Sequence, residues 1–279
     1  MSQREVTIYV PCYNAAAHID RCIKSLLAQT FPVKEILVIN DGSTDDSMDR
    51  VRKYPQVRII EHEGNKGLGV ARNTALKNIT TEFVANIDSD CVAEPDWLER
   101  LMDNMLEGKI AGVGSMLIES NRETVPDYWR VIHMKQHWGA LPIRNPQWLY
   151  GHSAVFRRSA LMAVGGYLDK YRTNYEDLDI SRRLRAAGFD LVYEPKAKVY
   201  HLRKDTAYTV IRTRWRWTSL GVHGPITPWE IMKNQGRNLI RMTKYTLQDL
   251  IHFRFSLLGL DFALGFYSIY ADMRSIWHR

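Results

Sequence analysis

The sequence predicts an α/β protein with a Rossmann-like, mostly parallel sheet flanked by helices and followed by a helical C-terminal appendage. Strand-like and helix-like patterns alternate through the first hundred residues. The runs EILVIN and EFVANI are largely apolar, which is typical of strands buried on both faces of a sheet. The alternation is lost in residues 218–279, which contain a long apolar run. These observations place the sheet first in the chain and the appendage last.

The first half of the chain is predicted as strand, helix, strand, helix, strand, helix, strand. EVTIYV is the first strand, and the helix after it places Ile19, Cys22 and Ile23 on one apolar stripe. EILVIN is the second strand. A short polar helix near 46–53, the strand VRIIE and a helix over 68–78 then lead to the fourth strand, EFVANI. This order predicts a parallel sheet with helices on both faces.

Polar or glycine-rich segments follow all four predicted strands. In chain order they are PCYNA, NDGSTDDS, EGNKGLGVARN and DSD. In such sheets ligands bind outside the carboxyl ends of the strands, and these ends share one rim. A single polar segment would mean little. Four on one rim favour a ligand that is phosphorylated and that carries a cation.

The second half of the chain begins with a segment of weaker periodicity, 116–148, which is rich in Trp and His. Its aromatic side chains either pack as core or line a substrate pocket. Regular patterns return with GHSAVFRRSALMAVGGY, which predicts a strand and a short helix that Gly165 and Gly166 stop.

A further helix is predicted over YEDLDISRRLRAAGF and ends at Gly188. The spacing of Asp177, Ile180 and Leu184 places Asp177 on the inward face of the first turn and directs Glu176 elsewhere. An acid in that position is either stabilised by the helix dipole or takes part in chemistry.

Composition bounds the class of protein. A chain of 279 residues can bury a full core, as one large domain or as one domain with an appendage. Its three cysteines show no spacing typical of zinc or of a disulfide framework, which favours a reducing compartment. We expect no signal peptide, because no charged leader and apolar stretch precede the first strand.

Charge is unevenly distributed along the chain. The net charge is +7, and residues 201–279 supply the excess with 12 Lys or Arg against 5 Asp or Glu. A basic C-terminal quarter favours an anionic partner, although a solvated basic surface would have the same composition.

The C-terminal quarter contains two unusual stretches. RTRWRW, at 212–217, alternates basic and aromatic residues. The apolar run at 255–271 is barely long enough to span a bilayer and carries Asp261 near its middle, so we expect it not to span. The run is predicted either as an amphipathic helix in the membrane interface, flanked by Arg254 and Arg274, or as a helix packed on the domain.

Together and in this order, the motifs resemble those of family 2 glycosyltransferases of the GT-A fold. VPCYNAAAHIDRCIKSLLAQTF and EILVINDGSTDDS are similar to the family's nucleotide-binding half, and GNKGLGVARNTAL to its phosphate-side loop and helix. DSD matches the DxD motif, GGYLDKYRTNYEDLDISRRLRAAGF the segment with the ED motif, and AKVYH a strand that often ends in a metal-side His. The resemblance covers 5–217. It implies a nucleotide-sugar-binding half over 1–114 and an acceptor-side half over 115–217. The tail lies outside the resemblance, and from its charge and apolar run we expect a basic helical appendage over 218–279 that associates with a membrane.

The resemblance implies a metal site and a base. Asp90 would be the direct ligand of Mn²⁺ or Mg²⁺, and His201 would complete the metal shell; carboxylate oxygens suit both ions. Asp88 would face the ribose or the waters of the metal. The plainer alternative for Asp88 and Asp90 is turn formation. Asp177 would take the proton from the attacking acceptor hydroxyl.

Further residues receive roles from the resemblance. Asp41 resembles the acid that contacts the uracil N–H in UDP-using members. The residues implied in nucleotide-sugar binding are Pro11, Tyr13, Asn14, Asp41, Lys66, Arg72, Asp88 and Ser89. Those implied in supporting the acceptor or the active site are Glu176, Arg214 and Trp215.

One departure from the family pattern bears on processivity. Processive members carry QxxRW after the ED helix, whereas this chain has IRTRW, with Ile211 in the place of Gln. We therefore expect an inverting, metal-dependent, non-processive glycosyltransferase. It would move one sugar from a nucleotide-diphospho-sugar, UDP-linked by preference, to a hydroxyl of a lipid-linked or cell-envelope glycan. The protein would be cytoplasmic, peripheral on the cytoplasmic face of the membrane, with no nucleic-acid partner.

Other classes of protein also fit parts of the sequence. GLGVAR, followed by Asp88, fits an NAD(P)-dependent Rossmann oxidoreductase, although Arg72 stands where close helix packing requires Gly or Ala. A nucleotidyltransferase shares the sheet architecture, but VPCYNAA lacks the glycine-rich, basic loop of that class. RTRWRW would suit a non-catalytic binder of anionic glycan or nucleic acid.

Overall fold

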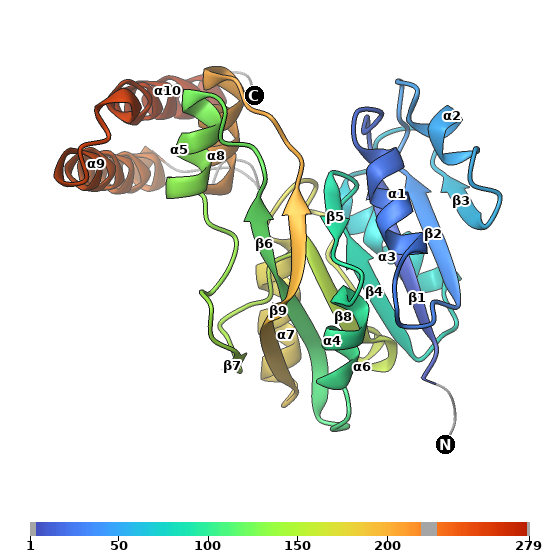
Figure 1. Ribbon diagram of the computed structural model, residues 1–279. Helices are drawn as coiled ribbons and strands as arrows, with labels where there is room; N and C mark the ends of the chain where they lie inside the picture. Colours follow the sequence, from blue (N-terminus) through green and yellow to red (C-terminus); the bar gives the residue numbers. More distant parts are fainter. Residues whose placement is uncertain (1–3, 219–227, 278–279) are drawn as a thin grey trace. The chain divides into compact units, whose positions relative to one another are not determined.

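The computed structural model describes residues 4–218 and 228–277, which form two compact units (Figure 1). The first unit, which we call the sheet unit, comprises Met1–Ser120 and Gln136–Leu202. The second, the helical unit, comprises Asn121–Lys135 and Arg203–Arg279.

These units divide the chain at other points than the sequence analysis did. The expected acceptor-side half, 115–217, contributes to both units. The C-terminal segment of the helical unit begins at Arg203, whereas the expected appendage begins at residue 218. Within the expected appendage, residues 219–227 and 278–279 lie outside the described residues.

The sheet unit contains all the strands of the described chain. Its strands are β1 (Val6–Cys12), β2 (Glu35–Asn40), β3 (Val57–Glu61), β4 (Phe83–Ile87), β5 (Cys91–Ala93), β6 (Ile110–Glu119), β7 (Ile143–Arg144), β8 (Ser153–Arg157) and β9 (Asp190–His201). Its helices are α1 (Ile19–Leu27), α2 (Ser47–Val51), α3 (Leu68–Asn78), α4 (Trp97–Asp103), α6 (Arg158–Ala163) and α7 (Glu176–Ala186). The predicted helix over 68–78 is confirmed as α3.

Strand order along the sheet is β3-β2-β1-β4-β8-β6-β9-β5, with β7 paired to β9. The first four strands are parallel, as predicted. Their register aligns the carboxyl ends, since Cys12 lies opposite Asn40 and Asn40 lies opposite Glu61. The second half of the sheet is mixed, because β8 runs antiparallel to β4 and β5 runs antiparallel to β9. The sequence analysis did not predict these reversals.

Helices cover both faces of the sheet. Alternate side chains of a strand point to opposite faces, so neighbours on β1 enter different cores. Ile8 packs with α1, α2 and α4, whereas Tyr9 packs with α3, α6 and α7. Gly165 and Gly166 follow α6 with φ of 80° and 69°, and Gly188 follows α7 with φ of 86°. Glycine tolerates this left-handed backbone, which explains why both helices end where predicted.

The helical unit is built from α5 (Val125–His133), α8 (Ala207–Thr218), α9 (Pro228–Ile251), a short 3₁₀ turn (Phe255–Leu257) and α10 (Leu258–Trp277). Thr124 caps α5, since its hydroxyl accepts the Asp127 backbone N–H at 3.3 Å. The fully buried ring of Trp129 packs in one core with Val210 on α8 and Leu264 on α10. Thus α5 is a long-range insertion that completes this unit. Within the described chain, no helix combines the length and apolarity needed to cross a bilayer.

Candidate active site

The two aspartates of DSD lie at the end of β4, a strand held between β1 and β8. The Asp88 backbone N–H donates to the His152 carbonyl at 2.9 Å, and the Cys91 N–H donates to the Asp88 carbonyl at 3.0 Å. Backbone groups therefore close this turn. The side chains of Asp88 and Asp90 are 37% and 30% exposed, so both carboxylates can reach a ligand from a fixed backbone.

The structure brings Asp90 and His201 together from positions 111 residues apart. His201 ends β9, directly opposite Cys91 of β5 and Glu119 of β6. Its Nε2 lies 3.1 Å from Asp90 Oδ2, and its Nδ1 lies 2.7 Å from Glu119 Oε2. The imidazole is thus oriented by a carboxylate on one side and faces the DSD turn on the other.

Arg72 occupies the interior of the site. It projects from α3, is 1% exposed, and donates from Nη2 to the Gly151 carbonyl at 2.7 Å. The same nitrogen lies 3.4 Å from Glu176 Oε1 and 3.7 Å from Asp88 Oδ1. The prediction that Glu176 points elsewhere is wrong, because its side chain is buried and Arg72 of α3 meets the first turn of α7. Arg72 therefore joins the DSD turn to the ED pair.

Two backbone N–H groups hold the carboxylate of Asp177. Gly151 donates to Oδ2 at 2.9 Å and Leu178 donates to Oδ1 at 2.8 Å. On the same helix, Arg183 contacts Asp179 at 2.6 Å. The carboxylate of Asp177 is thus fixed next to Gly151, just before β8, the strand that pairs with β4.

Gly151 is the hub of this arrangement. Its carbonyl also accepts from Asn86 Nδ2 at 2.8 Å, on the strand that leads to DSD. A Cβ at this position would lie 2.9 Å from Glu176 Oε1 and 3.2 Å from Asp177 Cβ. Only glycine leaves room for both members of the ED pair.

Burial disfavours the charged forms of the clustered carboxyls. It raises the pKa of Asp88 to about 6 against the lowering effect of Arg72. Burial, followed by the charge of Asp177, raises the pKa of Glu176 to about 8, and burial also raises the pKa of Asp177. Burial alone would lower the pKa of His201, but Asp90 and Glu119 raise it to about 10. The buried carboxyls therefore favour their neutral forms, and a cation bound beside them would favour their charged forms.

Asp41 lies where β2 ends, but its carboxylate is used inside the protein. Oδ1 lies 2.7 Å from His62 Nδ1 and accepts the Lys66 backbone N–H at 2.9 Å. Oδ2 accepts the Gly67 N–H at 2.8 Å, and Asp41 is 4% exposed. Asp41 thus anchors the loop before α3. Its base-reading role stays a prediction, while the Lys66 side chain remains exposed.

The segments after β1 and β2 are tied to each other. Asn14 has φ of 51°, and its Oδ1 accepts the Thr44 N–H at 2.8 Å. Tyr13 is 49% exposed, and Pro11 and Ser89 are half-buried. These positions are consistent with a nucleotide pocket at the rim, and the individual roles stay predictions.

Backbone contacts at the start of α3 disfavour the dinucleotide interpretation. The Leu68 N–H donates to the Arg172 carbonyl at 2.9 Å, and the Gly69 N–H donates to the Tyr171 carbonyl at 3.1 Å. A Cβ at Gly69 would lie 2.7 Å from the Leu168 carbonyl oxygen. The helix N–H groups that a pyrophosphate would use are occupied, and the glycine serves chain packing.

Arg214 and Trp215 lie on α8, in the helical unit. Arg214 Nη2 donates to the Tyr245 hydroxyl at 2.7 Å, and Trp215 Nε1 donates to Asp272 Oδ1 at 2.7 Å. Both side chains are thus engaged with other helices of that unit, which does not favour RTRWRW as a nucleic-acid surface. Their role in supporting the acceptor stays a prediction.

Sequence reasoning missed Glu119, Gly151 and His62. Glu119 had a signal, since it is an acid at the end of the apolar run AGVGSMLIE, as Asp88 is after EFVANI. Gly151 and His62 had none, because their partners come from remote segments.

Comparison with known proteins identifies the family. Residues 7–165 match the sequence model of glycosyl transferase family 2. The chain belongs to this family.

Two curated relatives of this family 2 glycosyltransferase illustrate its kinship. The pre-mycofactocin glycosyltransferase of Mycobacterium tuberculosis (strain CDC 1551 / Oshkosh) is 32% identical over 208 residues, which is 72% of this chain and 43% of the relative. The poly-beta-1,6-N-acetyl-D-glucosamine synthase of Staphylococcus epidermidis (strain RP62A) is 26% identical over 230 residues, 77% of this chain and 54% of the relative. The chain spans about half the length of these relatives.

Solved structures confirm the expected GT-A fold of this family 2 member. The mannosyltransferase PcManGT of Pyrobaculum calidifontis, in complex with GDP-Man and Mn²⁺, has a TM-score of 0.64 at 18% identity and covers 95% of this chain and 87% of its own. Staphylococcus aureus TarS 1–349, in complex with UDP-GlcNAc, has a TM-score of 0.57 at 20% identity, with 83% and 70% covered.

The residues of this family 2 member fit a divalent cation. Asp90 offers a carboxylate oxygen and His201 an imidazole nitrogen, donor types found together in protein metal sites. Glu119 accepts from the other nitrogen of the His201 ring, as outer-shell carboxylates do for metal-bound histidines. Mg²⁺ and Mn²⁺ need few protein ligands when substrate phosphates supply the rest.

Proposed function

We propose that this protein is an inverting, metal-dependent, non-processive glycosyltransferase that moves one sugar from a UDP-sugar to a hydroxyl of a glycan acceptor. One observation carries the proposal. Asp177 is held by the Gly151 N–H at 2.9 Å, and Asp90 lies beside His201 at 3.1 Å. Arg72 links the two sides, because it donates to the Gly151 carbonyl at 2.7 Å and lies 3.7 Å from Asp88 of the DSD turn. Such a transfer needs a base and a cation-binding acid close together.

The Asp177 carboxylate acts as the general base. It takes the proton from the acceptor hydroxyl while the acceptor oxygen forms a bond to the anomeric carbon of the donor sugar. The bond from that carbon to the diphosphate oxygen breaks, and the nucleoside diphosphate leaves with the electron pair. Attack opposite the leaving group inverts the anomeric centre. The N–H groups of Gly151 and Leu178 orient the carboxylate by hydrogen bonds and leave it ionised, so that it can still accept a proton.

Asp90 and His201 would hold Mn²⁺ or Mg²⁺. A bound ion of this kind would stabilise the negative charge of the diphosphate leaving group. Asp88, turned toward Arg72 at 3.7 Å, would face the ribose or the waters of the ion. The two aspartates thereby differ in role, although they are one residue apart.

The donor class follows from the family resemblance and from the neighbouring structures. TarS and GalNAc-T7 are described in complex with UDP or UDP-GlcNAc, and PcManGT with GDP-Man. UDP is our first choice, because Asp41 resembles the acid that contacts uracil in UDP-using members. Because the Asp41 carboxylate is already hydrogen-bonded within the protein, GDP-sugars are our second choice of donor.

An aromatic cluster supports a glycan acceptor. The rings of Trp138 and Trp148 lie 4.6 Å apart between centroids, and Tyr150 lies 5.8 and 5.7 Å from them. All three are half-buried, and Tyr150 directly precedes the Gly151 that orients the base. Half-exposed aromatic faces suit the apolar face of a sugar ring. Trp148→Ala should raise the acceptor KM with a smaller effect on the donor KM.

The helical unit has a surface suited to an anionic membrane. On and after α9, Ile251 and Phe253 are 71% and 79% exposed, and on α10 Phe266 is 73% exposed. Basic side chains are exposed on the same helices, namely Lys233, Arg237, Lys244 and Arg274.

Acids contribute little to that surface. Asp249, Asp261 and Asp272 are all buried. The net charge of the exposed side chains of α9 and α10 is therefore more positive than the net charge of all their side chains. Apolar and basic groups together favour anionic lipid headgroups. We therefore propose peripheral attachment to the cytoplasmic face and a lipid-linked or cell-envelope glycan as the acceptor.

The decisive experiment measures donor binding and transfer. Thermal unfolding of the wild type with UDP-, GDP-, dTDP- and CMP-sugars, with and without Mn²⁺, should show stabilisation by one nucleotide class only when Mn²⁺ is present. Asp90→Ala should lose that stabilisation. The exposed acid Asp49 provides a control, since Asp49→Ala should retain it. Metal-independent stabilisation, or an unchanged response of Asp90→Ala, would contradict the metal site.

Membrane attachment is tested by sedimentation with vesicles. Vesicles rich in phosphatidylserine should sediment the wild type at low salt, and purely zwitterionic vesicles should not. The double variant Ile251→Ser, Phe253→Ser should remain in the supernatant, because it removes exposed apolar contacts without disturbing the core. Equal sedimentation of wild type and double variant would refute this surface as the point of attachment.

A further inference from the structure

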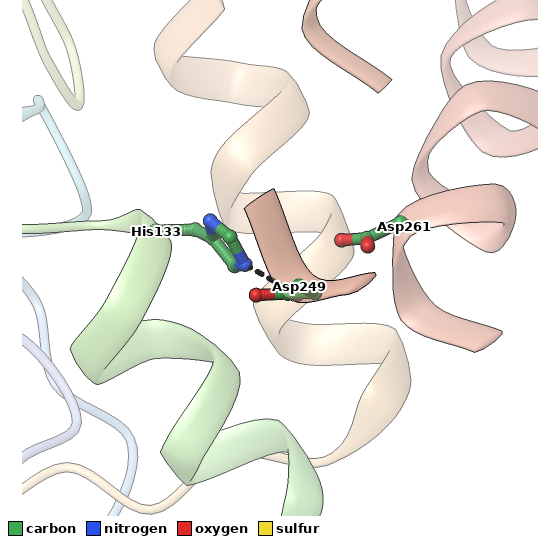
Figure 2. Close-up of side chains that lie close together, drawn as sticks. All are labelled: His133, Asp249 and Asp261. Atoms are coloured by element: carbon green, nitrogen blue, oxygen red, sulfur yellow. Dashed lines mark hydrogen bonds and ion pairs between the residues drawn. The ribbon is translucent and has the colours of Figure 1, made fainter. Parts of the chain in front are cut away.

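A second group of metal-ligating side chains lies in the helical unit, apart from the transfer chemistry. His133 ends α5, Asp249 lies near the end of α9, and Asp261 lies near the start of α10. All three are buried, with Asp249 and Asp261 fully so. Figure 2 shows the three side chains pointing toward one another from three separate segments.

The ligand atoms are close enough to share one ion. One candidate ligand atom from each residue lies within 4.8 Å of the other two. His133 Nε2 lies 2.8 Å from Asp249 Oδ2. A tetrahedral ion with bonds of about 2.0–2.1 Å holds its ligands about 3.4 Å apart, so small side-chain shifts suffice.

One carboxylate oxygen in this cluster points to an absent partner. Asp261 Oδ1 accepts the indole N–H of Trp129 at 2.8 Å. Asp261 Oδ2 is buried without a hydrogen-bond partner among the described residues. A buried polar oxygen left unpaired is costly, and its carboxylate faces the other two side chains in Figure 2.

The imidazole of the cluster is held in place by its neighbours. The ring of His133 packs on that of Tyr245, with centroids 4.2 Å apart, and on Trp129 at 5.0 Å. Arg254 Nη1 contacts the far oxygen of Asp249, Oδ1, at 3.4 Å, so that Oδ2 faces His133. A divalent cation would complete the coordination of a pre-oriented site.

We propose that His133, Asp249 and Asp261 bind one Zn²⁺ ion. One imidazole nitrogen and two carboxylate oxygens form a donor set that zinc accepts, with water at a fourth position. The ion would join α5 to α9 and α10 and so fix the inserted segment in the helical unit. Its role is structural, and the proposal does not depend on the transfer reaction.

The competing interpretation is a proton shared between Asp249 and Asp261. The two interpretations predict opposite effects of Asp261→Asn. An asparagine keeps the acceptor for Trp129 and resembles a protonated aspartate, so it would preserve a proton-sharing pair. The same change would remove an anionic ligand and abolish zinc binding.

The test uses the full chain, purified without a histidine tag, stripped with chelator and re-equilibrated with ZnCl₂. The wild type should retain one more zinc per chain than Asp261→Asn by elemental analysis. With saturating zinc, its midpoint of thermal unfolding should rise by about 5 °C or more beyond any rise seen for Asp261→Asn. Zinc held at Asp90 and His201 contributes equally to both proteins.

A matched control lies on the same helix. Asp272 is buried on α10 but pairs with Trp215 and with Asn234 Nδ2 at 2.7 Å, so Asp272→Asn should keep the zinc response. If Asp261→Asn fails to fold, His133→Gln gives the same comparison. Equal zinc content in wild type and variants, with equal zinc-dependent shifts of the midpoint, would overturn the proposal in favour of a shared proton.

Discussion

The Arg72 guanidinium lies 3.4 Å from the Glu176 carboxylate, with both side chains buried. This contact crosses from α3, in the first half of the sheet unit, to α7, in the second. Arg72 also reaches Asp88 at 3.7 Å. The guanidinium is therefore the physical link between the proposed cation side of the site and the proposed base.

The coupling between these two residues can be measured. The measurement compares the free energies of unfolding of Arg72→Met, Glu176→Gln and the double variant by denaturant titration. Because the pair is buried and in direct contact, the effects should be non-additive by about 1–3 kcal/mol. The exposed pair Lys34 and Glu5, with side chains 61% and 48% exposed, serves as the control, and its effects should be nearly additive. Additive effects at Arg72 and Glu176 would show that they do not act together.

Gly151→Ala should impair transfer without unfolding the protein. The new Cβ would meet Glu176 Oε1 at 2.9 Å and Asp177 Cβ at 3.2 Å and would displace the proposed base. We expect kcat to fall by about a hundredfold, since small displacements of reacting groups have effects of that size. The donor Kd should change little. Gly108→Ala, where a Cβ would meet nothing within 4 Å, is the matched control.

Asp177→Asn should reduce kcat by about 10²–10⁴-fold while donor binding persists, because the amide cannot accept the acceptor proton. In the wild type, burial raises the pKa of Asp177. The base is active when deprotonated, so kcat/KM should fall as the pH drops through a value above the usual 3.9 or so of aspartate. A pH profile that is flat through the acidic range would contradict the assignment.

Asp41→Asn should mainly lower stability. The amide nitrogen would replace one oxygen that accepts from His62 and Lys66, or the one that accepts from Gly67. Losing a hydrogen bond to a buried charged group costs about 1.5–3 kcal/mol in the free energy of unfolding, measurable by urea titration. If stability were unchanged and UDP binding alone were lost, base reading would be the principal role of Asp41.

The sequence analysis predicted the parallel strands β1–β4 and the helix α3, because apolar runs and helical periodicity are local signals. The family resemblance implied that Asp90, His201 and Asp177 belong to one site. The sequence analysis did not foresee that internal contacts would hold Asp41. A strand end or a helix start fixes the backbone position of a residue. The partner of its side chain comes from a remote segment, such as the one that contains Gly151.

The helix α7 illustrates a second limit. The helical spacing correctly predicted that Ile180 and Leu184 are buried. The spacing did not predict the burial of Glu176. Arg72 of α3 contacts the first turn of α7 on a side that the apolar stripe does not mark. Likewise, no local pattern marks α5 as part of the helical unit, since its partners lie far along the chain; Asp249 and Asp261 are more than a hundred residues away.

The insertion of α5 has a consequence for synthesis on the ribosome. Trp129 and its partner Asp261 are 132 residues apart, and His133 and Asp249 are 116 apart. At about 5–20 residues per second, α5 emerges on the order of ten seconds before the helices that bury it. During that interval its tryptophan is available to chaperones. Premature termination before α9 would leave α5 without part of its core, so quality control of this protein would be sensitive to the synthesis of α9 and α10.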